Sequence, residues 1–199
     1  MVLGTVNVGS LSGKSMELVD LMERRRINIL CIQETKWRGE KAKEIGNGYK
    51  LFYYGMNNRR NGVGIILDPE MKKNVLEVNR KSDRLMRVKI QVENTIINIV
   101  SAYASQTGCE EEEKEEFWDN LGCVIQNIPP LEVMWVGGDL NGHGEGNTGS
   151  SECMGRHGVG IRNDDGDRIV DWAKAGGESV AKQHRPLVYK IKIKTIKPI

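Results

Sequence analysis

The stretch from Val133 to Gly142 constrains the fold of this chain most. Its first four residues are apolar, and they run into two glycines and then Asp139-Leu140-Asn141. A short apolar run of this kind is typical of a buried strand, and the glycines let the backbone turn tightly or approach a ligand closely. Alternate side chains of an extended chain share one side, so Asp139 and Asn141 are expected to point the same way. The stretch predicts a buried strand that delivers a carboxylate and an amide to one place.

A carboxylate beside an amide suits phosphate-ester chemistry. Aspartate supplies a hard oxygen for Mg²⁺ or accepts a proton from water, and asparagine donates to a developing oxyanion without adding charge. The alternative interpretation is a turn that only ends a strand, because Asn, Asp and Gly dominate turns. The choice between the two depends on the residues upstream.

Two apolar segments of strand character flank a helix near the N-terminus. The first, residues 3–8, carries Asn7 near its end, and the second, residues 27–32, is closely followed by Glu34. Apolar residues at helical spacing between them predict a helix that runs to Arg26. This order predicts an α/β fold in which Glu34, like Asp139, is a carboxylate at the end of a buried strand.

The middle of the chain predicts antiparallel strands and one more helix. A polar loop is expected up to Gly48, and then a hairpin whose tip, residues 57–61, is basic. Three further segments are rich in alternating apolar and polar residues, with a tight turn at Glu93-Asn94. The expected strands are residues 49–54, 62–67, 75–78, 85–92 and 95–103, and the helix is 110–128. Parallel and antiparallel signals together predict mixed sheets.

Polar residues thus follow several strands, and we expect them at one edge of the packed sheets. Carboxylates gathered at strand ends favour a Mg²⁺ site, because magnesium is often held by one or two carboxylates while waters and a substrate phosphate complete its shell. Glu34 is the strongest ligand candidate. Tyr103 ends a strand and is placed to offer its hydroxyl to a phosphate, or it is simply an amphipathic tyrosine at a strand end. The residues expected at this edge are Asn7, Glu34, Tyr103, Asp139 and Asn141.

Composition excludes several classes of protein. The chain has 199 residues, 39% of them apolar, which fits one domain with a core. The net charge is +2, but residues 176–199 hold six Lys or Arg and one Glu, which leaves −3 for the rest. The four cysteines lack paired spacing, so we expect reduced thiols, an intracellular protein and no zinc site. Neither a membrane span nor a signal peptide is expected.

Three motifs, in this order along the chain, resemble those of the endonuclease/exonuclease/phosphatase superfamily. Their residue sequences are most similar to those of the endonuclease domains of RTE-type LINE retrotransposons. The motifs are Leu30-Cys31-Ile32-Gln33-Glu34-Thr35-Lys36-Trp37, Asn61-Gly62-Val63-Gly64-Ile65-Ile66-Leu67 and Gly137-Gly138-Asp139-Leu140-Asn141-Gly142-His143. The resemblance covers roughly residues 3–175. It implies a four-layer α/β sandwich of two mixed sheets with outer helices, and Mg²⁺-dependent cleavage of DNA, with Mn²⁺ as another usable metal. It divides the chain into a partial domain, 1–175, and a divergent basic tail, 176–199.

The resemblance also implies roles for individual residues. Glu34 would hold the metal, and Asp139 would orient or deprotonate the attacking water. Asn7 and Asn141 would contact the scissile phosphate or a metal-bound water, and Tyr103 would support the phosphate. The residues expected to contact DNA are Arg59, Arg60 and His143; for His143, which lies in a long loop, a plain surface position is an equal alternative.

The chain departs from the family pattern toward its C-terminus. Further strands, a later aspartate and a closing Ser-Asp-His are missing, and His184 has no Asp before it. We therefore expect an incomplete fold, an open sheet edge that a protein partner could cover, and impaired catalysis. The alternative function is a non-catalytic binding protein of nucleus or chromatin. A third possible function is a phosphatase of inositol lipids or other small phosphates, which the residues of the first motif disfavour. The expectation of a nuclear location rests on the resemblance alone.

Overall fold

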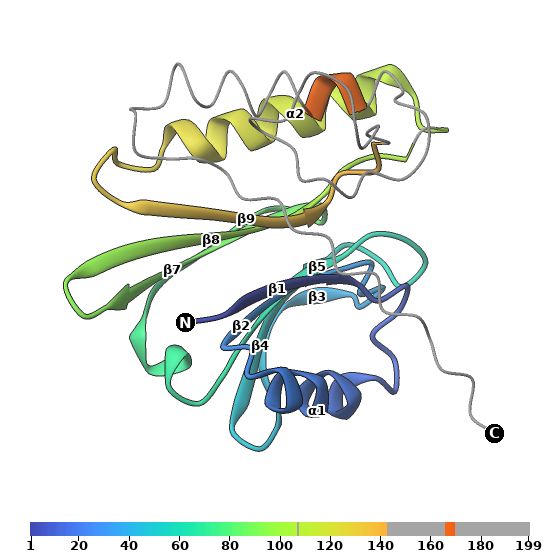
Figure 1. Cartoon of the computed structure of the whole chain (residues 1–199). Helices are drawn as coiled ribbons and strands as arrows, with labels where there is room; N and C mark the ends of the chain where they lie inside the picture. The colour runs from blue at the N-terminus through green and yellow to red at the C-terminus, as the bar shows by residue number, and fades with distance from the viewer. Residues whose placement is uncertain (107, 143–165, 170–199) are drawn as a thin grey trace, which may run out of the picture.

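Two β-sheets pack face to face, and one helix covers the outer face of each (Figure 1). The computed structural model describes residues 1–106, 108–142 and 166–169. The elements are β1 Leu3–Asn7, α1 Ser15–Arg25, β2 Ile29–Gln33, β3 Gly39–Gly46, β4 Tyr49–Gly55, β5 Val63–Leu67, the 3-10 helix η1 Met71–Asn74, β6 Val75–Ser82, β7 Leu85–Val92, β8 Thr95–Tyr103, α2 Glu111–Gln126 and β9 Val133–Asp139. The expected four-layer α/β sandwich is confirmed.

Both sheets are mixed, as the sequence predicts. The first has the order β1-β2-β5-β4-β3, and only β1 and β2 are parallel. The second has the order β6-β7-β8-β9, and only β8 and β9 are parallel. A helix joins each parallel pair, α1 in the first sheet and α2 in the second. Within each pair the carboxyl ends therefore meet at one edge.

The apolar core has three layers. Val19 and Met22 of α1 are fully buried against the first sheet, Ile65 and Ile99 lie between the sheets, and Leu121 of α2 is buried against the second. Burying a side chain of this size stabilises the fold by roughly 1.5–3 kcal/mol. The inner layer fixes how far apart the two sheets lie.

Two adjacent glycines permit close approach at the end of β9. A Cβ added at Gly137 would lie 3.0 Å from the side chain of Cys31 on β2. A Cβ added at Gly138 would lie 2.4 Å from the carbonyl oxygen of Ala102 on β8. The glycines therefore let β9 pack tightly against both β2 and β8 just before Asp139.

The polar loop expected up to Gly48 is wrong in part, because residues 39–46 form β3. This strand lies at the edge of the first sheet and most of its residues are exposed, so Ile45 is its only buried residue. Without a buried face it lacks the alternation by which a strand is recognised. The expected boundary near residue 175 and the basic tail lie outside the described residues.

Candidate functional site

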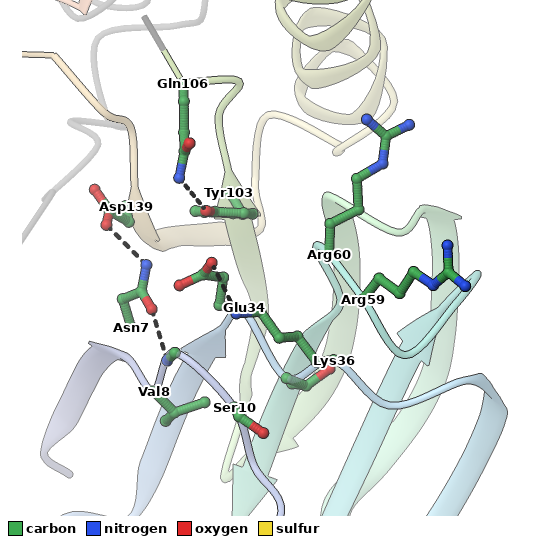
Figure 2. A network of polar contacts seen from close by, with 12 residues as sticks. Asn7, Val8, Ser10, Glu34, Lys36, Arg59, Arg60, Tyr103, Gln106 and Asp139 are labelled. Atoms are coloured by element: carbon green, nitrogen blue, oxygen red, sulfur yellow. Dashed lines mark hydrogen bonds and ion pairs between the residues drawn. The ribbon is translucent and has the colours of Figure 1, made fainter. Parts of the chain in front are cut away.

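A hydrogen bond between the ends of β1 and β9 forms the centre of the site. Asn7 Nδ2 donates to Asp139 Oδ2 at 3.1 Å, which joins one sheet to the other (Figure 2). Asn7 Oδ1 accepts the backbone N–H of Gly9 at 2.9 Å. Because Gly9 fixes the amide oxygen, the amide nitrogen must face the carboxylate. The Asp139 carboxylate is thereby held in one orientation.

Glu34 lies beside this pair. It follows β2 in a left-handed backbone conformation, with φ of 59°, and its Oε2 is 4.0 Å from the position that a Cβ on Gly9 would take. The next residue, Thr35, is fully buried, and its N–H donates to the carbonyl of Gly62 at 3.0 Å. A non-glycine residue in this conformation costs roughly 1–3 kcal/mol and often marks a functional site. The surrounding backbone thus holds the carboxylate in place.

Lys36 is a member of the site that the sequence reasoning missed. Its Nζ is 3.5 Å from Glu34 Oε1, and its side chain is 30% exposed (Figure 2). The signal available was its place two residues after Glu34 in the first motif. Lys36 itself has a left-handed backbone conformation, with φ of 51°. The alternation of side chains along an extended strand therefore does not predict which way it points.

Tyr103 ends β8 and is buried, and Gln106 Nε2 donates to its hydroxyl oxygen at 3.2 Å. Burial raises the pKa of the phenol, and the negative charges of Glu34 and Asp139 raise it further. The Gln106 hydrogen bond and the charge of Arg84 act in the opposite direction. The phenol is therefore neutral at physiological pH and keeps a proton to donate.

Arg84 was also missed. It is buried in the turn between β6 and β7, with its guanidinium 5.4 Å from the centre of the Tyr103 ring. Its Nη1 donates to the carbonyl of Ala104 at 3.2 Å, and its Nη2 to Glu113 Oε1 of α2 at 2.5 Å. An arginine in a polar turn gives no sequence signal of burial, so only the tertiary structure reveals this support for Tyr103.

Asn141 lies beyond the end of β9, with φ of 52°, so the alternation argument does not extend to it. Its N–H donates to Asp139 Oδ1 at 3.3 Å, while its Nδ2 donates to the carbonyl of Ala104 at 2.7 Å. The turn that the alternative interpretation expects is therefore present: an Asx-type turn closes the strand, and it also orients Asp139.

Arg59 and Arg60 lie in the exposed loop between β4 and β5. The Oδ1 of Asn57 accepts both of their backbone N–H groups, at 2.9 and 3.0 Å. Figure 2 shows their side chains to one side of Glu34 and Tyr103 rather than between them. His143 lies outside the described residues.

The donor set at this edge fits a hard divalent cation. Within the described residues, no group of three or more His, Cys, Asp or Glu gathers as a complete metal cage. Magnesium does not require one, because it keeps several waters and binds through one or two carboxylates and a substrate phosphate. Glu34, 22% exposed at its side chain and flanked by Asn7 and Asp139, meets that requirement.

Solved structures with the same fold include DNA-processing enzymes. An AP endonuclease from Archaeoglobus fulgidus superposes with a TM-score of 0.61 at 21% identity, over 86% of this chain and 69% of that one. The endonuclease domain of TRAS1, a telomere-specific non-LTR retrotransposon, gives 0.65 at 18% identity, over 87% and 70%. The chain has the fold of the endonuclease/exonuclease/phosphatase superfamily. A third structure with this fold, D. rerio TDP2 with a single-strand DNA product, gives 0.54 at 15% identity, over 90% and 69%.

In sequence, the chain is similar to craniofacial development protein 2. The Bos taurus protein is 31% identical over 175 residues and the Tragulus javanicus protein 30% identical over 175, in each case 85% of this chain. The chain spans 29% and 30% of the length of these relatives. No family model matches it. Among the described residues, no helix is both long and apolar enough to cross a membrane.

Proposed function

We propose that this chain is an endonuclease that hydrolyses phosphodiester bonds in DNA with Mg²⁺, or with Mn²⁺ in its place. The observation that carries the proposal is the hydrogen bond from Asn7 to Asp139, which joins the two sheets beside Glu34. A carboxylate held in one orientation next to a second, accessible carboxylate suits metal-assisted attack of water on a phosphodiester. The AP endonuclease and the TRAS1 endonuclease domain share the fold and support this reading.

Each side chain has a role that follows from its contacts. Glu34 would hold the divalent ion, which when bound supplies a positive charge to the phosphate and makes its water more acidic. Asp139, fixed by Asn7 and by the N–H of Asn141, orients the attacking water and accepts its proton. The neutral phenol of Tyr103 donates to a non-bridging phosphate oxygen, where negative charge develops.

Nicking of supercoiled plasmid in the presence of Mg²⁺ tests the proposal. We expect Glu34→Ala and Asp139→Ala each to reduce nicking on the order of 10²-fold or more. Glu17→Ala on α1 and Asp119→Ala on α2 are matched controls, because both carboxylates are exposed and lie on the outer helices. Thermal melting establishes that all four variants fold. Nicking that is absent in the unmodified chain, or unchanged in both site variants, contradicts the proposal.

The second candidate function is DNA binding without cleavage. The exposed Arg59 and Arg60 favour it independently of the carboxylates. Its signature is salt-sensitive binding to DNA by a chain that does not nick, because contacts to phosphate release counterions. We also propose a nuclear location, because either function acts on DNA, and fluorescence microscopy of the tagged protein in a mammalian cell checks it. A protein partner at the outer edge of β9, the last strand of the second sheet among the described residues, remains a prediction.

A further inference from the structure

The loop after β2 and the loop between β4 and β5 are tied to each other through their backbones. A Cβ added at Gly62 would lie 2.2 Å from Thr35 Oγ1, so the two loops pack without a gap. Three hydrogen bonds of 3.0 Å join them: Thr35 N–H to the Gly62 carbonyl, Lys36 N–H to the Asn61 carbonyl, and Arg38 N–H to Asn58 Oδ1. Residues 34–38 and 56–62 therefore form one structural unit, which we name the paired-loop rim.

The rim is anchored to the second sheet. Asn61 is buried, and its Nδ2 donates to Asp83 Oδ2 at 3.1 Å. The N–H of Gly62 donates to the Asp83 carbonyl at 2.9 Å. Asp83 precedes Arg84, which supports Tyr103. The backbone of the rim is therefore fixed relative to both carboxylates of the candidate site.

The rim carries an excess of positive charge. Lys36, Arg38, Arg59 and Arg60 are its cations, and the three arginines are exposed. Its single carboxylate, Glu34, lies at the inner end against Lys36. In the part of the chain that the structure describes, no carboxylate pairs with any of the three arginines. These guanidinium groups are available to a ligand.

Resting on the proposed function, we infer that the paired-loop rim binds the backbone phosphates of double-stranded DNA to one side of the cleaved bond. Guanidinium groups bind phosphate through several parallel N–H donors, and a fixed loop avoids the entropy cost of ordering on binding. Lys36 lies against Glu34 at the inner end of the rim, so a strand that lies along the arginines would run toward Glu34 (Figure 2). Arg38 is the cation of the rim that neither the motifs nor the basic hairpin tip indicated.

The salt dependence of binding tests this inference without cleavage. Affinity for a fluorescent duplex is measured in EDTA over a series of salt concentrations. The association constant K falls as salt rises, and each phosphate contact adds about 0.9 to the steepness of log K against log salt. We therefore expect Arg59→Ala/Arg60→Ala to make this dependence shallower by about 1.8, and Arg38→Ala by about 0.9. The control Arg24→Ala/Arg25→Ala removes the same charge from α1 and should leave the slope unchanged. Equal slopes for the rim and control pairs overturn the inference.

A neutral variant separates the rim's shape from its charge. Asn58→Ala removes the bond to Arg38 N–H without changing charge, and we expect several-fold weaker binding with little change in slope. Affinity equal to that of the unmodified chain would show that the tie is irrelevant. The two proposals can fail separately. If Asp139→Ala loses nicking but the rim variants keep the salt dependence of the unmodified chain, only the inference about the rim is refuted. If the rim variants weaken the salt dependence but the unmodified chain never nicks DNA, only the proposed catalysis is refuted.

Discussion

The phenol of Tyr103 is subject to opposing influences on its pKa. Burial and the charges of Glu34 and Asp139 favour the neutral form, while the guanidinium of Arg84 stacked on the ring favours tyrosinate. Burial and the two carboxylates outweigh the guanidinium, so the pKa of Tyr103 in the folded chain is above its ordinary value. That makes the residue a hydrogen-bond donor at every physiological pH, and Arg84 is a cation that limits the rise in its pKa.

Arg84→Gln should raise the pKa of Tyr103 further, because it removes the positive charge while keeping a polar side chain of similar length. The measurement is the alkaline titration of tyrosinate absorbance, with Tyr103→Phe used to isolate this residue from the other tyrosines. The folded pKa exceeds the unfolded value of about 10, so the stabilising contribution is present below pH ~10 and is lost as pH rises through the folded pKa. A pKa that stays the same or falls contradicts the assigned contact.

Cys31 lies between the sheets on β2, and burial raises the pKa of its thiol to about 12. The thiolate is the reactive form, so native Cys31 should resist alkylation at pH 8 while the exposed Cys123 is modified. Peptide mass spectrometry after a short exposure to iodoacetamide gives the two rates. The raised pKa also means that this thiol's contribution to stability is lost as pH rises from about 9 toward 12. Equal labelling of Cys31 and Cys123 would show that the sheets open readily.

At the scale of elements, the sequence was informative where a segment has a buried face. The strands with Asn7, Glu34 and Asp139 at or just after their ends are rich in apolar residues, and their place in the sheets follows from burial. The edge strand β3 lacked that signal because only Ile45 is buried. Left-handed residues such as Glu34 are set by the packing of neighbouring loops, which local propensity does not contain.

The end of β9 should tolerate no side chain at Gly138. A methyl group there would meet the backbone of Ala102 at 2.4 Å, and backbone yields less readily than a side chain. We expect Gly138→Ala to destabilise by about 1–3 kcal/mol or more, and Gly137→Ala by less, because it meets the Cys31 side chain at 3.0 Å.

Gly122 in α2 provides the control, because a Cβ there meets nothing within 4 Å. Gly122→Ala should stabilise by about 0.5–1 kcal/mol through the loss of backbone freedom in the unfolded chain. Urea unfolding of the three variants gives the order. If Gly138→Ala is no less stable than Gly122→Ala, the close contact between β8 and β9 is not as described.

At the scale of the whole molecule, the candidate site is split between two sheets. Asn7 and Glu34 belong to the first and Tyr103 and Asp139 to the second, so the packing of the sheets sets the distances between them. The sequence predicts these residues at strand ends, because parallel strands finish at one edge. It does not predict the bond from Asn7 to Asp139, because that contact spans 132 positions and depends on how two separate sheets meet.

A buried polar cluster joins the sheets directly beneath the site. Ser101 Oγ of β8 donates to the carbonyl of Ile32 at 3.2 Å and accepts from Gln33 Nε2 of β2 at 3.3 Å. Gln33 Nε2 also donates to Thr5 Oγ1 of β1 at 3.1 Å. All three polar side chains are at most 2% exposed, so each bond is costly to break. Because Gln33 immediately precedes Glu34, the cluster fixes Glu34 relative to the second sheet.

Ser101→Ala should therefore affect both stability and the response to metal. The loss removes the side-chain bond to the buried Ile32 carbonyl and one of the two bonds that the Gln33 amide donates, at a cost of about 1–3 kcal/mol. Val124→Ala in α2 is expected to lower stability by a similar amount, but it lies on the outer side of the second sheet, away from the junction. If the proposed chemistry holds, both variants should melt earlier, while only Ser101→Ala should require several-fold more Mg²⁺ for half-maximal nicking. The same Mg²⁺ requirement in both variants would mean that the two halves of the site are held together by the outer bond from Asn7 to Asp139, and not by the packing beneath it.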